Sequence, residues 1–153
     1  EYLGNHYEIL FIPGGYQFEL VEIWNPNTFM PGIGADYEAY WGRKDYANNT
    51  HGAFYAGRLA ALEHLLKMKR QASILIVREI LPSYDVPMGI WQLRETVRGA
   101  FQKVPEKFET IEQAIQRINS RLVSKGNWLK KSKLVQGLKQ QTSIKKFVKQ
   151  VPL

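Results

Sequence analysis

The chain has 153 residues, of which 44% are hydrophobic, 23% charged and 12% aromatic. This is the composition of an ordinary globular domain, and it excludes collagen-like, low-complexity and wholly disordered chains. The sequence has no cysteine, which excludes disulfide frameworks, thiolate zinc sites and cysteine nucleophiles. No apolar run reaches the ~18 residues that a membrane span needs, so we expect no membrane partner.

The net charge of +7 is concentrated in the C-terminal third. Residues 1–100 carry 9 Lys and Arg against 11 Asp and Glu, whereas residues 101–153 carry 12 against 3. From Gln113 onward there are ten basic residues and no acidic one. This asymmetry is typical of a nucleic-acid or membrane partner, or of a basic tail, and it indicates where an anion would bind.

The first elements are predicted to form a β-hairpin. Residues 7–12 are rich in β-branched and aromatic side chains, and residues 18–24 partly alternate apolar with acidic ones, as in a half-exposed strand. The Pro-Gly-Gly sequence at 13–15 is typical of a turn. Residues 25–49 are predicted to be an aromatic-rich loop, which is either functional or an ordered cover over the core.

A helix, a buried strand and a second helix are expected next. Residues 50–70 predict a helix capped by Thr50. Residues 73–77 form a short apolar run typical of a buried strand that ends in Arg78 and Glu79. After a loop, residues 89–101 predict another helix. The expected core stripe of the first helix consists of Tyr55, Leu59, Leu62 and Leu66.

The C-terminal part is predicted to be helical and then exposed. Thr110 and Gln113 have the spacing of a capping box, which begins a helix with the apolar stripe Ile111, Ile115, Ile118 and Leu122. A very basic helix is expected at about 128–138. We therefore predict an α/β or α+β fold in which an N-terminal β-hairpin and a buried strand pack with about four helices.

Residues 1–138 are expected to form one domain, followed by a flexible, exposed basic tail at 139–153. The chain starts at Glu1 rather than at a methionine, and no charged-then-apolar leader precedes the first strand. We therefore expect it to be one part of a longer protein.

Several arginine and glutamate residues stand among apolar neighbours, where an unpaired charge is costly. Arginine forks match phosphate geometry and carboxylates hold the forks in place, so these residues are candidates for an anion or phosphate site. The alternative is that they are internal ties between helices and a strand. The candidates are Arg58, Arg78, Glu79, Arg94, Glu95 and Arg98, with Glu63 as a further orienting carboxylate.

No motif in the chain indicates a metal or a nucleotide cofactor. His6, His51 and His64 lack the spacing of a metal-binding pair, and there is no phosphate-binding loop or nucleophile elbow. We therefore expect no metal and no cofactor in this chain, and no catalytic residue can be named.

The most specific motif lies near the C-terminus, where residues 141–148 follow the pattern Gln-x-x-aliphatic-x-x-aromatic-apolar. It resembles the PIP box, the peptide by which replication and repair proteins dock on the PCNA sliding clamp. Ile144 and Phe147 would present one apolar plug and Gln141 a hydrogen bond, whereas Val148 stands where the family usually has a second aromatic residue. The alternative is that these residues cover the domain's own core.

The body of the chain resembles the C-terminal half of the Nre family, archaeal proteins implicated in DNA repair. The resemblance covers about residues 2–101 and is carried by the segments NHYEILFIPGGYQFELVEIW, GRKDYA, GAFYAGRLAALEHL, KRQASILIVREI and VPMGIWQLRETVRGAF. It implies a cytoplasmic, nucleoid-associated repair factor with a terminal PCNA-docking motif. Some members carry a zinc motif in an N-terminal half that is absent from this sequence, and the family supplies no established reaction.

We therefore expect an archaeal repair factor that docks on PCNA and binds DNA electrostatically, without sequence preference. The DNA backbone is expected to contact Lys130, Lys131 and Lys133. One alternative is an enzyme that processes nucleic acid or nucleotides at the arginine–glutamate site. Another is a structural partner domain whose arginines are internal ties.

Overall fold

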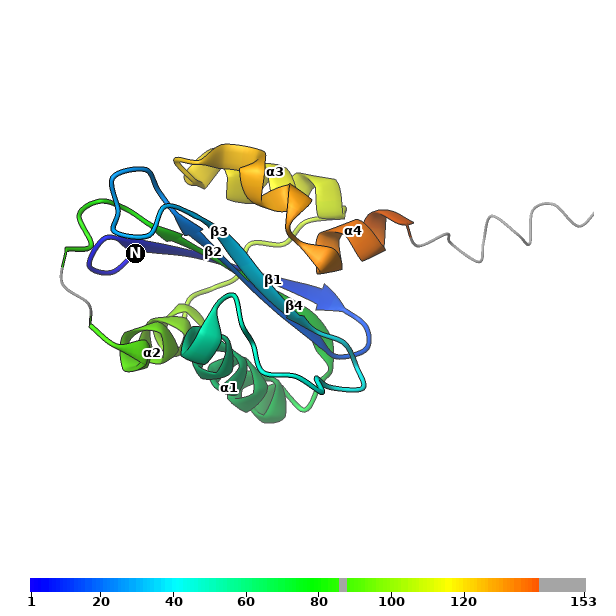
Figure 1. The fold of residues 1–153 in the computed structure, drawn as a ribbon. Helices are drawn as coiled ribbons and strands as arrows, with labels where there is room; N and C mark the ends of the chain where they lie inside the picture. The colour runs from blue at the N-terminus through cyan, green and yellow to red at the C-terminus, as the bar shows by residue number, and fades with distance from the viewer. Residues whose placement is uncertain (86–87, 141–153) are drawn as a thin grey trace, which may run out of the picture.

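Four strands form one sheet that carries helices on both faces (Figure 1). The computed structural model describes residues 1–85 and 88–140. Within this part the strands lie in the order β1-β4-β2-β3, and the predicted mixture of strands and helices is confirmed. The strands are β1 (Asn5–Pro13), β2 (Gln17–Trp24), β3 (Gly32–Glu38) and β4 (Ala72–Ile80).

The predicted hairpin between β1 and β2 is wrong, because β4 lies between these two strands. β4 pairs antiparallel with β1 and parallel with β2. Every residue of β4 is buried, so this strand needs a neighbour on each side and a helical layer on each face. β3, which pairs antiparallel with β2, lies within residues 25–49, where a continuous loop was expected.

β4 also runs further than its apolar core suggested. Arg78 and Glu79, which the sequence placed at the end of the strand, are buried within it, and β4 continues to Ile80. They point to opposite faces of the sheet, as successive strand residues do. Both charges are tolerated there because each has partners, which are described below.

One face of the sheet is covered by α1 (His51–Met68) and α2 (Ile90–Ala100). The boundaries of both helices agree with the prediction to within a residue or two, but the expected stripe on α1 is wrong. Leu59 and Leu66 are exposed, and α1 instead buries a face of small residues with Phe54 and Leu65. A side chain at Gly57 would come within 3.2 Å of Leu93 and 3.3 Å of Ile76, so close contact with both α2 and the sheet requires small residues there.

The other face is covered by α3 (Ile111–Arg121), the 3₁₀ helix η1 (Lys125–Lys130) and α4 (Lys133–Gln140). The capping box at Thr110 is present, and Ile115, Ile118 and Leu122 are buried, which confirms the prediction for α3. The single basic helix expected at 128–138 is instead η1 and α4. The helix is interrupted between them at Ser132, which is buried and donates its hydroxyl to Glu19 of β2.

No described helix is both long and apolar enough to cross a bilayer. α4 ends at Gln140, slightly beyond the predicted end of the domain, and the predicted tail from 141 onward lies outside the described residues.

Candidate functional site

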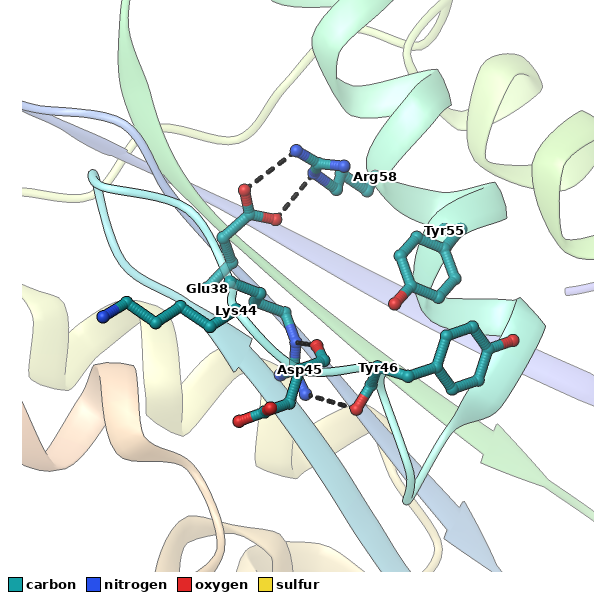
Figure 2. Close-up of a pocket in the computed structure, with 7 residues that line it drawn as sticks. Glu38, Lys44, Asp45, Tyr46, Tyr55 and Arg58 are labelled. Carbon is teal, nitrogen blue, oxygen red and sulfur yellow. Dashed lines mark hydrogen bonds and ion pairs between the residues drawn. The ribbon is translucent and has the colours of Figure 1, made fainter.

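An open pocket of about 270 Å³ lies between α1 and the loop that joins β3 to α1 (Figure 2). The lining is polar and aromatic, with charges of both signs. It consists of Glu38, Arg43, Lys44, Asp45, Tyr46, Tyr55 and Arg58.

Arg58, one of the candidate anion-binding residues, is paired at the edge of this pocket. Its Nη2 donates to Glu38 Oε1 at 2.9 Å, and its Nε lies 2.6 Å from Oε2 of the same carboxylate (Figure 2). The Glu38 side chain is almost completely buried, whereas about a third of Arg58 is exposed. The pair joins the end of β3 to α1, so most of the charge on Arg58 is already neutralised.

Arg43 holds the loop in its conformation. Its guanidinium donates to the carbonyls of Tyr37 (2.8 Å), Tyr46 (3.1 Å) and Asp45 (3.2 Å). It also lies over the ring of Phe54, 5.1 Å from the centroid. Because these contacts use most of its donors, Arg43 stabilises the loop rather than offering a free charge.

Asp36 connects β3 to the start of α1. It accepts hydrogen bonds from the backbone N–H of Asn49 (2.9 Å) and of Thr50 (2.7 Å) and from the Thr50 hydroxyl (3.0 Å). Burial alone would raise the pKa of Asp36, but these hydrogen bonds outweigh it and hold the pKa below its ordinary value. The sequence did not single out Asp36, because an isolated aspartate in a predicted loop has no distinguishing pattern.

The lowered pKa predicts an acid-sensitive contribution to stability. A carboxyl whose pKa is lower in the folded state stabilises the protein above its unfolded pKa of about 4, and this stabilisation is lost as the pH falls through the folded value. Asp36→Asn should therefore destabilise the chain at pH 7 and make its stability vary less with pH below about 4. Urea unfolding of both proteins from pH 3 to pH 7 measures this. Parallel pH profiles would show that Asp36 makes no such contribution.

Arg78 lies on the α1–α2 face of the sheet in a closed polar cluster. Its Nη1 donates to Glu22 Oε1 at 2.6 Å and its Nε to Asn5 Oδ1 at 2.9 Å. Burial raises the pKa of Glu22, and the attraction of Arg78 opposes this rise. Three aromatic rings surround the guanidinium, with centroids 5.7–6.0 Å away: Tyr7, Trp24 and Tyr84.

Arg98 and Arg94 lie near the surface between α1 and α2. Arg98 forms a fork with Glu63, with Nε 2.8 Å from Oε2 and Nη2 2.7 Å from Oε1, and its Nη1 donates to Glu95 at 2.7 Å. Arg94 Nε donates to the same Glu95 oxygen at 3.1 Å. The fork joins the two helices across a second open pocket that Arg98 and Glu63 line.

The structure therefore distributes the arginine–glutamate candidates over separate places. Arg58 pairs with Glu38, whose cross-strand partner in β2 is Phe18. Arg78 pairs with Glu22, which lies four residues after Phe18 in β2. At the usual rise of a strand, about 13 Å separate Phe18 from Glu22 along β2. Glu79 points to the opposite face. The sequence showed which arginines need partners, but it did not show that their partners differ.

Two buried glutamates hold the C-terminal layer to the sheet. Glu79 accepts hydrogen bonds from the backbone N–H groups of Val123 (2.9 Å) and Ser124 (2.7 Å). Glu19 accepts from the Ser132 hydroxyl (2.5 Å) and from the N–H of Lys133 (2.7 Å). The prediction of a half-exposed β2 is thus wrong, because both of its acidic residues are buried: Glu19 faces the backbone of the C-terminal layer, and Glu22 pairs with Arg78 on the opposite face.

The C-terminal layer that these glutamates hold also carries exposed lysines. None of them forms an ion pair with another described residue, in contrast to Arg117 and Arg121 of α3, which pair with Glu106. They include the three DNA-backbone candidates and are Lys125, Lys130, Lys131, Lys133 and Lys139.

A family model described as "Archaeal Nre, C-terminal" matches residues 38–147. The chain belongs to the Nre family. It is 41% identical over 129 residues to the protein named DNA repair protein NreA from Archaeoglobus fulgidus, covering 82% of this chain and 33% of that protein. It is 39% identical over 155 residues to DNA repair protein NreA from Haloferax volcanii, covering 96% and 36%.

A third relative, named DNA repair protein NreB, from Archaeoglobus fulgidus, is 33% identical over 144 residues, covering 90% of this chain and 37% of that protein. This Nre chain thus spans about a third of the length of the curated relatives it matches. No solved structure matches it.

The region that matches the Nre model contains both pockets, all the arginine candidates and the lysine-bearing elements. It also reaches Gln141, Ile144 and Phe147 of the predicted PCNA-docking peptide. These three residues and Val148 lie outside the residues that the structure describes.

Proposed function

We propose that this chain is the C-terminal part of an archaeal DNA-repair protein, that it binds the DNA backbone through η1 and α4, and that it docks on PCNA through residues 141–148. The names of its Nre relatives support the repair role. The DNA-binding proposal rests mainly on one observation: the lysines of η1 and α4 form no ion pair with any residue that the structure describes, and they lie in a region without acidic residues. Action on DNA and PCNA implies a cytoplasmic, nucleoid-associated protein.

The lysines stand on backbone that the sheet holds in place. Glu19 accepts hydrogen bonds from the Ser132 hydroxyl and from the backbone at the start of α4, and Trp128 of η1 is buried and donates from its Nε1 to Asn119 Oδ1 at 2.8 Å. A charged surface on a fixed backbone loses little conformational entropy on binding. Lysine contacts of this kind attract phosphates and release counterions, but carry no base specificity.

Replacing Lys130, Lys131 and Lys133 together with alanine should weaken binding to all DNA sequences alike. If each lysine contacts one phosphate, the slope of log affinity against log salt should become less steep by about 3, about 1 per lysine. Fluorescence anisotropy with labelled duplexes of unrelated sequence, over a range of salt concentrations, measures both effects.

A matched control removes the same charge elsewhere: Lys67, Arg70 and Lys103, which are exposed near α1 and α2, are replaced with alanine. This variant should keep nearly the full salt slope. Equal losses in both variants would show that only net charge matters. A loss confined to one DNA sequence would contradict backbone binding.

The PCNA-docking proposal is supported by the motif and by its position, because it follows directly after α4 in the sequence. The enzyme alternative has less support. Its candidate arginines already pair with carboxylates, and the structure does not bring them together in one phosphate site.

A further inference from the structure

The loop between β3 and α1 displays three large aromatic side chains to solvent. Trp41 is 91% exposed, Tyr46 57% and Tyr40 55%. The rings of Tyr40 and Trp41 meet edge to face at 5.0 Å, and those of Tyr46 and Tyr55 lie 5.1 Å apart. Single exposed aromatics are common, but a group on one short loop indicates a surface that is used for binding.

The backbone of this loop is held in place, so its aromatics are presented in a defined arrangement. Arg43 donates to the loop carbonyls of Asp45 and Tyr46 and to that of Tyr37 in β3. Gly42 takes a positive φ of 83° in a turn closed by its N–H to Ala39 O at 2.9 Å. At the other end, buried Ala47 donates its N–H to the Tyr55 hydroxyl at 3.1 Å. Because the loop is already held in place, little conformational entropy is lost when a flat ligand stacks on its aromatic rings.

The loop begins at edge strand β3, beside the lysine-bearing layer, and leads to α1 on the opposite face of the sheet. Tyr37, the penultimate residue of β3, is the cross-strand partner of Glu19, and Glu19 accepts the N–H of Lys133 at the start of α4. In Figure 1 the loop leaves β3 at the end of the sheet over which α4 lies. Lys44 adds a positively charged side chain to the loop, and Asp45 is the acidic residue among residues 39–46.

We propose that Trp41, Tyr40 and Tyr46 stack on unpaired bases of single-stranded nucleic acid that crosses the β3 edge of the sheet, so that its phosphates reach the lysines of η1 and α4 on the other face. Aromatic faces next to a cationic track are the two features by which proteins hold single strands without sequence preference. The bases of an intact duplex are stacked on one another and do not offer their faces. This inference rests on the proposed function and deepens it, because it names the form of nucleic acid that the surface prefers.

The test compares a labelled single strand of about 16 nucleotides with a duplex of equal length, using the whole chain in equilibrium binding. Trp41→Ala should weaken single-strand binding about 5- to 100-fold and leave duplex binding within about twofold, as loss of one base–aromatic stack predicts. Trp41→Phe should restore most of the affinity. Because Trp41 is almost completely exposed, thermal melting should be the same in all three proteins.

Trp91→Ala is the matched control, since Trp91 is also exposed but lies on α2. It should change neither affinity. Unchanged single-strand binding by Trp41→Ala, or equal loss for single strand and duplex, would overturn the stacking proposal, and a protein partner for the loop would give the first of these results. If the lysine triple variant still loses duplex affinity, the proposed function survives that failure. If it loses none, the proposal that η1 and α4 bind the DNA backbone itself fails.

Discussion

Arg78→Ala should lower the free energy of unfolding by about 3–5 kcal/mol, because it leaves the buried Glu22 carboxylate without its partner. Glu22 and Arg78 each keep only 8% of their side-chain surface exposed, so water cannot replace the lost contact. The change also removes the donor to Asn5 Oδ1 and a cation among three aromatic rings. Urea unfolding monitored by tryptophan fluorescence measures this loss.

Two further variants separate the loss of an ion pair from a general intolerance of change. Replacing both partners, Arg78→Met with Glu22→Leu, should cost clearly less than either truncation, because no buried charge is left alone. Arg94→Ala should leave the melting temperature nearly unchanged, since Arg94 pairs at the surface with its exposed neighbour Glu95. An Arg78→Ala protein of unchanged stability would show that the pair of Arg78 with Glu22 does not stabilise the fold.

A chain that ends at Gln140 should lose all measurable binding to the cognate PCNA clamp. Small peptide interfaces depend on a few buried anchors, and the motif supplies them only through Ile144 and Phe147. Either Ile144→Ala or Phe147→Ala should therefore weaken docking by about 30-fold or more, which corresponds to a hot-spot loss of 2 kcal/mol. Calorimetry against the clamp measures these affinities.

Lys145 and Lys146 provide the contrast within the same peptide. Their replacement with alanine should slow association more than it shortens the lifetime of the complex, since exposed charges mainly steer the encounter. The truncated chain should keep its melting temperature and its affinity for DNA duplexes. Full-strength clamp binding by the truncated chain would place the docking surface elsewhere.

Sequence patterns within a single segment predicted the helices whose formation depends on contacts between residues close together in the chain. The capping box at Thr110 and the stripe through Ile115 and Ile118 specify α3, because both consist of contacts within one helix. The boundaries of α2 followed in the same way. The family resemblance, the basic C-terminal third and the PIP-box-like motif were also apparent without coordinates, since each is a property of residue order alone.

The order of the strands could not be predicted in this way. Segments 7–12 and 18–24 flank a turn-like sequence, yet β4, which follows almost fifty residues after β2, lies between them. The strand order follows from the burial of β4, which needs a paired strand at each edge and a helical layer over each face. The pairing is non-local, and no pattern within either segment contains it.

The sequence by itself determined that the chain is an Nre-type α+β domain with an excess of positive charge near its end, and that its arginines and glutamates require partners. Only the tertiary structure decided which partners these are. It placed Glu19 and Glu79 against the backbone of the C-terminal layer, Arg78 against Glu22, and Arg58 against Glu38. The reason is physical: a buried charge must be satisfied, but the groups that satisfy it come from whichever segments the sheet and its covering helices bring into contact.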